Sequence, residues 1–253
     1  MKVVWTLAWN TFREGLRDRF VLISFFLALA LFALSFILGA MSFEEHRRLL
    51  LHFGLLAIHG MGLAIAIFWG AYIVHREMDR QTCLMVLVRP VSRTQFLIGK
   101  YLGILLLMLN MWMVLGLSLF FLLKFSFSWD AYLVALLGTL LESMSVLAFT
   151  MLVSILVQPA IALFGGFAIF LLGYLQKDLF FFARKSQDVF FMNLADLIPW
   201  FIPQYFRINF RSSSLIDQGG LWEPFFQGAT PVLAWSLVYF SLTLFFFRRK
   251  DLV

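Results

Sequence analysis

The stretch FVLISFFLALALFALSFILGAM, from Phe20 to Met41, contains no Asp, Glu, Lys or Arg. A helix rises about 1.5 Å per residue, so about 20 apolar residues are needed to cross a hydrocarbon core roughly 30 Å thick. This stretch is long and apolar enough to be a transmembrane helix. It therefore indicates an integral membrane protein.

The rest of the chain repeats this pattern. Its 253 residues are 62% hydrophobic and 13% charged, whereas an ordinary soluble domain has about 25% charged residues. Besides 20–41, the stretches predicted to span the membrane are 49–74, 101–123, 131–157, 159–176 and 229–247. We expect an all-α integral membrane protein with six transmembrane helices, organised as a single transmembrane domain over 1–253.

Lys and Arg in the short connections predict the orientation of these spans. Most of them lie before the first span, between the second and third, and after the sixth: Lys2, Arg13, Arg17, Arg19, Arg76, Arg80, Arg89, Arg93, Lys100, Arg248, Arg249 and Lys250. The connections of opposite parity carry Arg47, Arg48 and Lys124. Both termini are therefore expected in the cytoplasm. The net charge of +6 is assigned to topology and to anionic lipid rather than to nucleic acid.

Residues 3–19 form an amphipathic pattern ahead of the first span. The apolar positions recur at helical spacing, at Trp5, Ala8, Trp9, Phe12 and Leu16. The opposite side carries Thr6, Asn10, Arg13 and Arg17. This pattern predicts a helix that lies in the membrane interface. Two roles stay open for it, a basic anchor that rests on lipid or a helix that also contacts a cytoplasmic partner.

The segment 75–100 is short and basic, and it joins the second and third spans. Residues 76–88 can continue the second span as a helix, and Pro90 forces Arg89 out of the helical region. Ser92, with Gln95 three residues later, predicts a capping box that begins a new helix. We therefore expect a helix, a sharp corner and a helix, with Arg89 and Arg93 projecting from the corner.

These residues resemble a known family. The resemblance covers essentially the whole chain and rests on Glu77, Thr82, Arg89-Pro90-Val91-Ser92-Arg93 and Gly99-Lys100, with support from Leu141-Glu142 and from Arg248-Arg249-Lys250-Asp251-Leu252. They are similar to permease subunits of ABC transporters of the ABC-2 type, the subgroup that includes the nitrous oxide reductase maturation permease. One departure is Gln81, where relatives often have glycine.

The resemblance implies that 75–100 is a coupling segment seated in a groove of a separate ABC ATP-binding subunit, with the N-terminal helix alongside. The residues expected to make this contact are Glu77, Arg80, Thr82, Arg89, Pro90, Val91, Ser92 and Arg93. It also implies an exporter of the bacterial inner membrane and a second permease copy, expected as a homodimer. ATP and Mg are expected in the ATPase, with no cofactor in this chain.

The sequence agrees that the ATPase is another chain. A P-loop requires the pattern G-x-x-x-x-G-K-[ST], but Gly99-Lys100 has Thr94 in place of the first glycine and Tyr101 after the lysine. Lys100 is instead predicted to snorkel at the start of the third span. The four His residues, the single Cys83 and the scattered acids form no catalytic or metal-binding constellation. We therefore expect a permease rather than an enzyme.

Polar residues inside the predicted spans are few. Glu142 is the acid within a span, and it is either a structural hydrogen-bonding residue or part of a translocation or proton path. His52 and His59 share a helix face without a neighbouring acid at ligand spacing, which favours interface or groove lining over a metal or proton site. On the same helix, Gly62, Ala66 and Gly70 form a stripe that permits close helix packing, within the subunit or across a dimer.

The segment 177–228 is long, aromatic and interspersed with charges. We expect amphipathic or re-entrant helices on the outer leaflet, which gate a substrate, contact a periplasmic partner or cover the dimer. Two other functions stay open for the chain as a whole. One is a membrane-embedded enzyme that modifies lipids, and the other is a non-transporting scaffold for a periplasmic partner. No feature of the sequence identifies a transported substrate.

Overall fold

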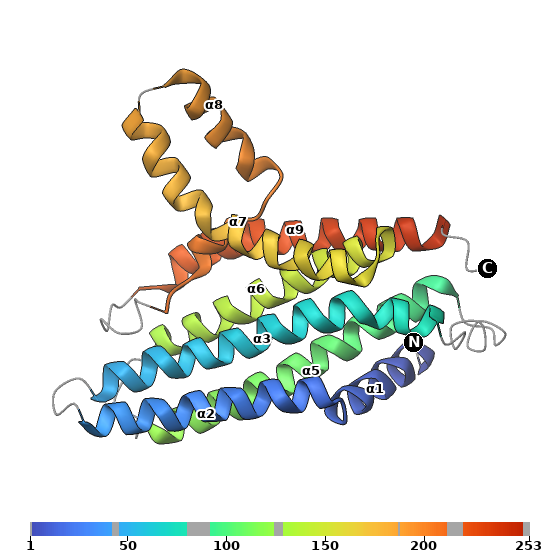
Figure 1. Cartoon of the computed structure of the whole chain (residues 1–253), viewed down its shortest axis with the longest axis horizontal. Coiled ribbons are helices and arrows are strands. Elements are labelled where there is room, and N and C mark those ends of the chain that lie inside the picture. The colour runs from blue at the N-terminus through green and yellow to red at the C-terminus, as the bar shows by residue number, and fades with distance from the viewer. Residues whose placement is uncertain are drawn as a thin grey trace.

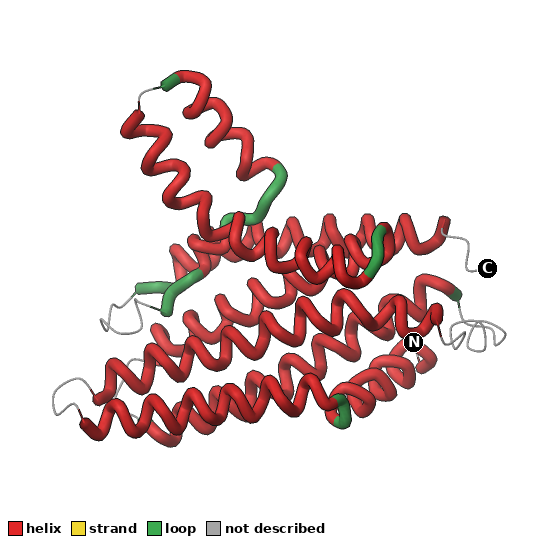
Figure 2. The backbone as a smooth tube through the Cα atoms, viewed as in Figure 1, coloured by secondary structure: helices red, strands yellow, loops and turns green. Residues whose placement is uncertain are grey.

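The computed structural model describes residues 2–41, 46–79, 92–123, 129–186, 188–211 and 220–249. Within these ranges the secondary structure is helical throughout, without strands (Figure 2). Six helices are long and apolar enough to cross a membrane. The predicted fold class, an all-α integral membrane protein with six spans, is confirmed.

The helices have the following bounds. The spans are α2 (Arg19–Met41), α3 (His46–Asp79), α5 (Arg93–Leu122), α6 (Trp129–Leu156), α7 (Pro159–Ser186) and α9 (Trp222–Arg249). The other elements are α1 (Lys2–Leu16), α8 (Val189–Leu197), and the 3-10 turns η1 (Ile198–Trp200) and η2 (Tyr205–Ile208). Several helices run past the predicted spans, because polar and charged residues continue them beyond the apolar core.

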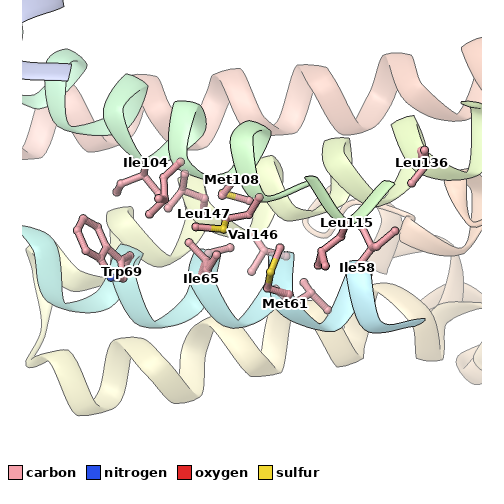
Figure 3. Packing of buried hydrophobic residues seen from close by; sticks show 14 of the residues in the cluster. Ile58, Met61, Ile65, Trp69, Ile104, Met108, Leu115, Leu136, Val146 and Leu147 are labelled. Carbon is pink, nitrogen blue, oxygen red and sulfur yellow. The ribbon is translucent and has the colours of Figure 1, made fainter. Parts of the chain in front are cut away.

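The spans run side by side as a bundle in which α3 and α6 are central (Figure 1). Their most apolar windows are 67% buried, against 28% for α2, α7 and α9. Met61 and Ile65 of α3 lie beside Val146 and Leu147 of α6, and Ile58 lies beside Leu115 of α5 (Figure 3). The outer helices therefore leave much apolar surface for lipid, while α3 and α6 are enclosed by protein.

Small residues bring α3 and α6 together. A Cβ atom on Gly62 would lie 2.8 Å from the Ser143 hydroxyl oxygen, and one on Gly70 would lie 3.1 Å from Thr150 Cβ. Ala66, between these two glycines, is fully buried. Because apolar burial does not favour one helix partner over lipid, close approach of this kind is a main source of helix association in membranes. The glycine stripe thus packs within the chain.

The helix α1 and the C-terminal end of α9 lie at the same end of the bundle, here called the terminal end (Figure 1). There α1 packs along α5. The N-terminal helix, predicted over 3–19, ends at Leu16 because Asp18 begins the next helix. The Phe20 N–H donates to Asp18 Oδ1 at 2.9 Å, and this contact satisfies a free backbone donor at the start of α2.

The region between the fifth and sixth spans has two unlike parts. The end of α7 and the antiparallel α8, residues 177–197, leave the bundle as a helical arm (Figure 1). Residues 198–211, the return limb, run from the arm back to the bundle, where Tyr205 and Ile208 are fully buried. The arm keeps large apolar side chains exposed, among them Phe181, Phe182 and Phe190.

Candidate functional site

Of the predicted ATPase-contacting residues, the structure describes the two that begin α5. Ser92 Oγ accepts a hydrogen bond from the Gln95 N–H at 3.2 Å, and Gln95 Oε1 accepts one from the Ser92 N–H at 3.2 Å. The predicted capping box is therefore confirmed. Arg93 extends from this cap to the C-terminal end of α9, where its Nη1 donates to the Arg248 carbonyl at 3.2 Å.

The remaining residues predicted for this contact are described in part or not at all. Glu77 belongs to the last turn of α3, and its side chain lies outside the described part of the chain. Arg80, Thr82, Arg89, Pro90 and Val91 also lie outside the described residues. What the structure establishes is the placement of the two flanking helices, α3 and α5.

Acidic residues of α1 and its following turn hold both flanking helices. Arg76 of α3 lies 3.5 Å from Glu14 Oε1 through Nη2 and 3.2 Å from Asp18 Oδ2 through Nη1. Lys100 of α5 lies 3.8 Å from Glu14 Oε2. The three helices are thus tied by one set of ion pairs, here called the terminal network.

Lys100 differs from its prediction. It was expected to snorkel toward water, but its side chain is 9% exposed and lies beside Glu14. Its ammonium group also lies 5.8 Å from the centroid of the Phe96 ring. The prediction failed because α1 covers this part of α5 and supplies an acid there, so the cation has a protein partner in place of solvent.

The structure shows which residues of α1 pack against the bundle, a point that the predicted apolar and polar sides left open. Ala8, Thr11 and Gly15 are buried against α5. Trp5 and Trp9 are 59% and 41% exposed. A Cβ atom on Gly103 of α5 would lie 2.7 Å from the Ala8 carbonyl oxygen, so small residues set this contact.

The other predicted residues of α1 surround its aromatic face. The Arg13 guanidinium lies 5.4 Å from the Trp9 ring centroid, and the Phe12 ring lies 5.2 Å from that of Trp9. Arg17 is exposed in the turn after α1. The helix therefore presents an aromatic and basic surface away from the bundle.

Glu142 lies in a buried group of polar side chains from separate elements. Its Oε2 accepts a hydrogen bond from the Tyr174 hydroxyl at 2.9 Å and lies 3.0 Å from His59 Nε2. Arg211 reaches the same group from the return limb, with Nη1 2.9 Å from His59 Nδ1 and Nη2 donating to the Tyr174 hydroxyl at 3.4 Å. We call these four residues the polar ring.

The contacts within the polar ring determine which nitrogen of His59 carries the proton. A guanidinium group donates hydrogen bonds and never accepts them, so His59 Nδ1 must be the acceptor toward Arg211. In a neutral His59, the N–H proton of the imidazole is then on Nε2, which faces the Glu142 carboxylate. His59 and Tyr174 thus each bridge the Arg211 guanidinium group to the Glu142 carboxylate.

Two members of the polar ring, His59 and Glu142, are deeply buried, so the loss of a partner there is costly. The side chains of His59 and Glu142 are 4% and 2% exposed. An uncompensated acid at the centre of a membrane helix costs about 2.5–3.5 kcal/mol on insertion scales. The sequence has no acid at ligand spacing from His59 on its own helix, and the acid that lies beside His59 comes from α6.

The two predicted histidines therefore differ. His52 is exposed, and its ring makes an edge contact with Phe53 at 5.9 Å. His59 is buried, with the Phe170 ring 5.8 Å away. In the described part of the chain, no group of three or more His, Cys, Asp or Glu residues could hold a metal ion.

The return limb is seated in the bundle near the ring. The Tyr205 hydroxyl donates to Ser145 Oγ at 3.1 Å, and Gln176 Nε2 donates to the Ile202 and Pro203 carbonyls at 3.3 Å each. Burial raises the pKa of the Tyr205 hydroxyl well above its ordinary value, so this group stays a donor. The limb is thereby fixed to both α6 and α7.

An apolar groove lies beside the ring between α3 and α7. Its volume is about 580 Å³, and its lining residues are Gly60, Leu63, Ala64, Ile67, Phe68, Ala160, Leu163, Phe164, Phe167 and Phe170. Phe170 both lines the groove and contacts the His59 ring. The apolar groove and the polar ring therefore share a wall.

Six apolar spans around a buried polar ring define a multi-pass α-helical membrane protein. Over residues 5–252, the sequence matches the family model described as ABC-2 family transporter protein. The chain belongs to this family, whose members are the membrane subunits of ABC transporters and are not themselves catalytic. The family implies an ABC ATP-binding partner. Among curated proteins, none matches the sequence.

Several residues of these sites were absent from the sequence predictions. Glu14 and Asp18 stand four residues apart, a helical spacing that could have indicated an acidic face toward the basic ends of neighbouring helices. Tyr174 and Arg211 gave no comparable signal. Arg211 lies in a loop-like stretch far along the chain from His59 and Glu142, so sequence spacing contains no trace of their contact.

Proposed function

We propose that this chain is the permease subunit of an ATP-driven ABC exporter in the bacterial inner membrane. In this proposal a separate ATPase subunit binds ATP and Mg, and 75–100 is the segment that contacts it. The terminal end then faces the cytoplasm, two permease copies pair as a homodimer, and the chain falls in the subgroup of the nitrous oxide reductase maturation permease.

The observation that carries this proposal is the terminal network. Glu14 binds Arg76 on α3 and Lys100 on α5, the helices on either side of the proposed coupling segment. Both helices continue without a break from this network into the bundle. A displacement of the segment by an ATPase would therefore move two spans and α1 together, as rigid helices transmit motion along their length.

The exposed face of α1 supports a contact outside the bundle. Trp5, Trp9 and Arg13 face away from α5. Tryptophan and arginine together suit the lipid headgroup region, because an indole ring has an apolar body and a polar N–H. In this proposal the face rests on lipid beside the ATPase.

The arm supports a role on the opposite side of the membrane. Phe181, Phe182 and Phe190 are 63%, 57% and 74% exposed, and Arg184 and Lys185 lie among them. Such a surface fits the outer leaflet or a periplasmic partner. The arm is also the observation that favours the alternative of a non-transporting scaffold, because it offers a large apolar surface beyond the bundle.

The test is to purify the tagged chain from its native host in mild detergent, identify co-purifying chains and measure ATP hydrolysis. In the variant, Arg89 and Arg93 are both changed to Glu. We expect a chain with a P-loop to co-purify with the unaltered protein and to be lost from the variant. The matched control changes Arg184 and Lys185 to Glu, which reverses two exposed charges on the arm.

The outcomes separate the proposed functions. Loss of the ATPase in the corner variant, with its retention in the arm variant, supports the permease. Equal retention in both variants would contradict the proposed coupling contact. Co-purification of a periplasmic partner without an ATPase, under conditions that preserve other ABC complexes, would support the scaffold instead.

A further inference from the structure

The return limb ends in the polar ring. Of the two charged residues in 198–211, Arg207 is exposed and Arg211 lies against His59 and Tyr174. We propose that Arg211 is a latch, which holds the return limb in the bundle through the polar ring, and that its release opens the core beside Glu142.

The seat of the limb is narrow. Gly138 of α6 faces the Ile208 carbonyl, Gly173 of α7 faces the Tyr205 ring, and a Cβ atom on Gly228 of α9 would lie 2.8 Å from the Arg207 carbonyl oxygen. Three helices therefore provide a notch without side chains, into which the limb fits. The notch complements the shape of the limb, whereas the charged contact of the limb with the bundle is made by Arg211.

The polar ring favours the state in which the return limb is bound to the bundle. Glu142 is buried in α6, and the cation that His59 and Tyr174 bridge to it belongs to the limb. If the limb leaves, the carboxylate keeps His59 and Tyr174 but loses the cation that both of them contact. Removal of one charge from a buried pair is strongly unfavourable, because little water is available to replace it.

Arginine suits this position better than lysine. The guanidinium group reaches His59 through Nη1, Tyr174 through Nη2 and Asn209 Oδ1 through Nε at 3.0 Å. A lysine ammonium group is a compact charge without this planar fork. Lysine at 211 should therefore hold the limb less well than arginine and better than alanine.

The latch is connected to the terminal network by one helix. His59 and Arg76 both lie on α3, about 25 Å apart along an axis that rises about 1.5 Å per residue. A shift of α3 would move His59 relative to Glu142 on α6 and Tyr174 on α7, and the ring would lose its bridging group. This link to transport rests on the proposed function, whereas the latch itself does not.

The test measures exposure of Ser145, a fully buried residue whose hydroxyl accepts from Tyr205 of the limb. Cys83, the single cysteine, is replaced by serine, and Ser145→Cys supplies a nearly isosteric thiol. The full chain is purified in detergent, so that a methanethiosulfonate reagent reaches both ends of the bundle. Ser186→Cys, at the exposed end of α7, gives the rate for an accessible thiol.

We expect Arg211→Ala to speed labelling of the Ser145→Cys thiol about tenfold or more, since the bridge to Glu142 is lost. Arg211→Lys should fall between the wild type and alanine. Glu142→Gln should also speed labelling, because it removes the anion without changing the size of the side chain. The matched control is Arg207→Ala, which removes the exposed charge of the same limb and should leave the rate unchanged.

Two results would overturn the latch. One is an unchanged labelling rate in both Arg211→Ala and Glu142→Gln, with monodisperse protein in each case. The other is an equal increase in Arg207→Ala, which would show that any loss of charge loosens the limb. Faster labelling confined to the ring variants supports the latch even if no ATPase co-purifies, so failure of the proposed function is a separate result.

Discussion

The described part of the chain holds charges together at two levels of the bundle, and the two groups differ in their exposure to solvent. In the terminal network, the side chains of Arg76 and Glu14 are 32% and 39% exposed. In the polar ring, those of His59 and Glu142 are 4% and 2% exposed. When an ion pair breaks at the first level, water replaces the lost partner, whereas little water is available at the second.

This difference predicts how much each group contributes to the stability of the fold. Exposed ion pairs contribute about 0–1 kcal/mol each, so the Arg76 pairs of the terminal network should add little to the free energy of unfolding. Removing one partner of a buried pair costs about 3–5 kcal/mol. In the proposed function, the region that receives motion from the ATPase has weak contacts, whereas the proposed latch at the polar ring has a strong one.

The largest loss of folding stability is expected for Glu142→Ala. It leaves Arg211 and His59 without their anion, and we expect a loss of about 2–3 kcal/mol, less than for a fully buried pair because Arg211 is half-buried. Thermal unfolding in detergent measures this loss. Glu142→Ala combined with Arg211→Ala should cost less than the sum of the single changes. A strictly additive result would show that the two residues are not coupled.

A comparable effect of different origin is expected for Gly138→Ala. The new Cβ atom would meet the Ile208 backbone carbonyl, which cannot move without shifting the limb. Overpacking of this kind costs about 1–3 kcal/mol, and the limb should also expose Ser145. Gly60→Ala is the control, because nothing lies within 4 Å of the added atom. Equal melting temperatures for the two variants would contradict the proposed seat.

A smaller effect is expected for Ser92→Ala. The change removes the acceptor for the Gln95 N–H and should cost about 1 kcal/mol locally. Hydrogen exchange of the first amides of α5 should then be about fivefold faster, while exchange in the middle of α5 stays the same. Ser92→Asp keeps an N-cap acceptor and should retain protection. Slow exchange in Ser92→Ala would show that other contacts hold this helix start.

The smallest effect on stability is expected for Arg76→Ala. The loss should be about 1 kcal/mol or less at low salt and should shrink in high salt, because exposed pairs are screened. Melting curves at two salt concentrations measure it, with Arg17→Ala, an exposed arginine of the neighbouring turn, as the control. A loss comparable with that of Glu142→Ala at either concentration would abolish the distinction between the two levels.

Much of the fold could be predicted from local sequence. Each span is a run of apolar residues long enough to cross a membrane, and backbone groups in hydrocarbon must satisfy one another within a helix. The start of α5 could likewise be predicted, because the capping box of Ser92 and Gln95 is a contact between residues three apart. Such features depend on neighbours in sequence, so the sequence displays them directly.

The candidate sites could be predicted only in part. The acid inside a span was recognised in Glu142, but its two contacts come from α3 and α7. The cation that these two residues bridge to it comes from the return limb. The acids of the terminal network were missed because their partners lie on helices that α1 reaches only after folding. Contacts between residues far apart in sequence produce no regular spacing from which they could be predicted.

By itself the sequence determined that this chain is a six-span helical membrane protein, because apolar length and helix capping are local properties. The tertiary structure alone decided that α1 ties α3 to α5 and that 198–211 returns to the bundle. It also placed His59 and Tyr174 between Arg211 and Glu142. The physical reason is that helices in lipid gain little from apolar burial, so close packing at glycines and polar contacts between helices decide which of them meet.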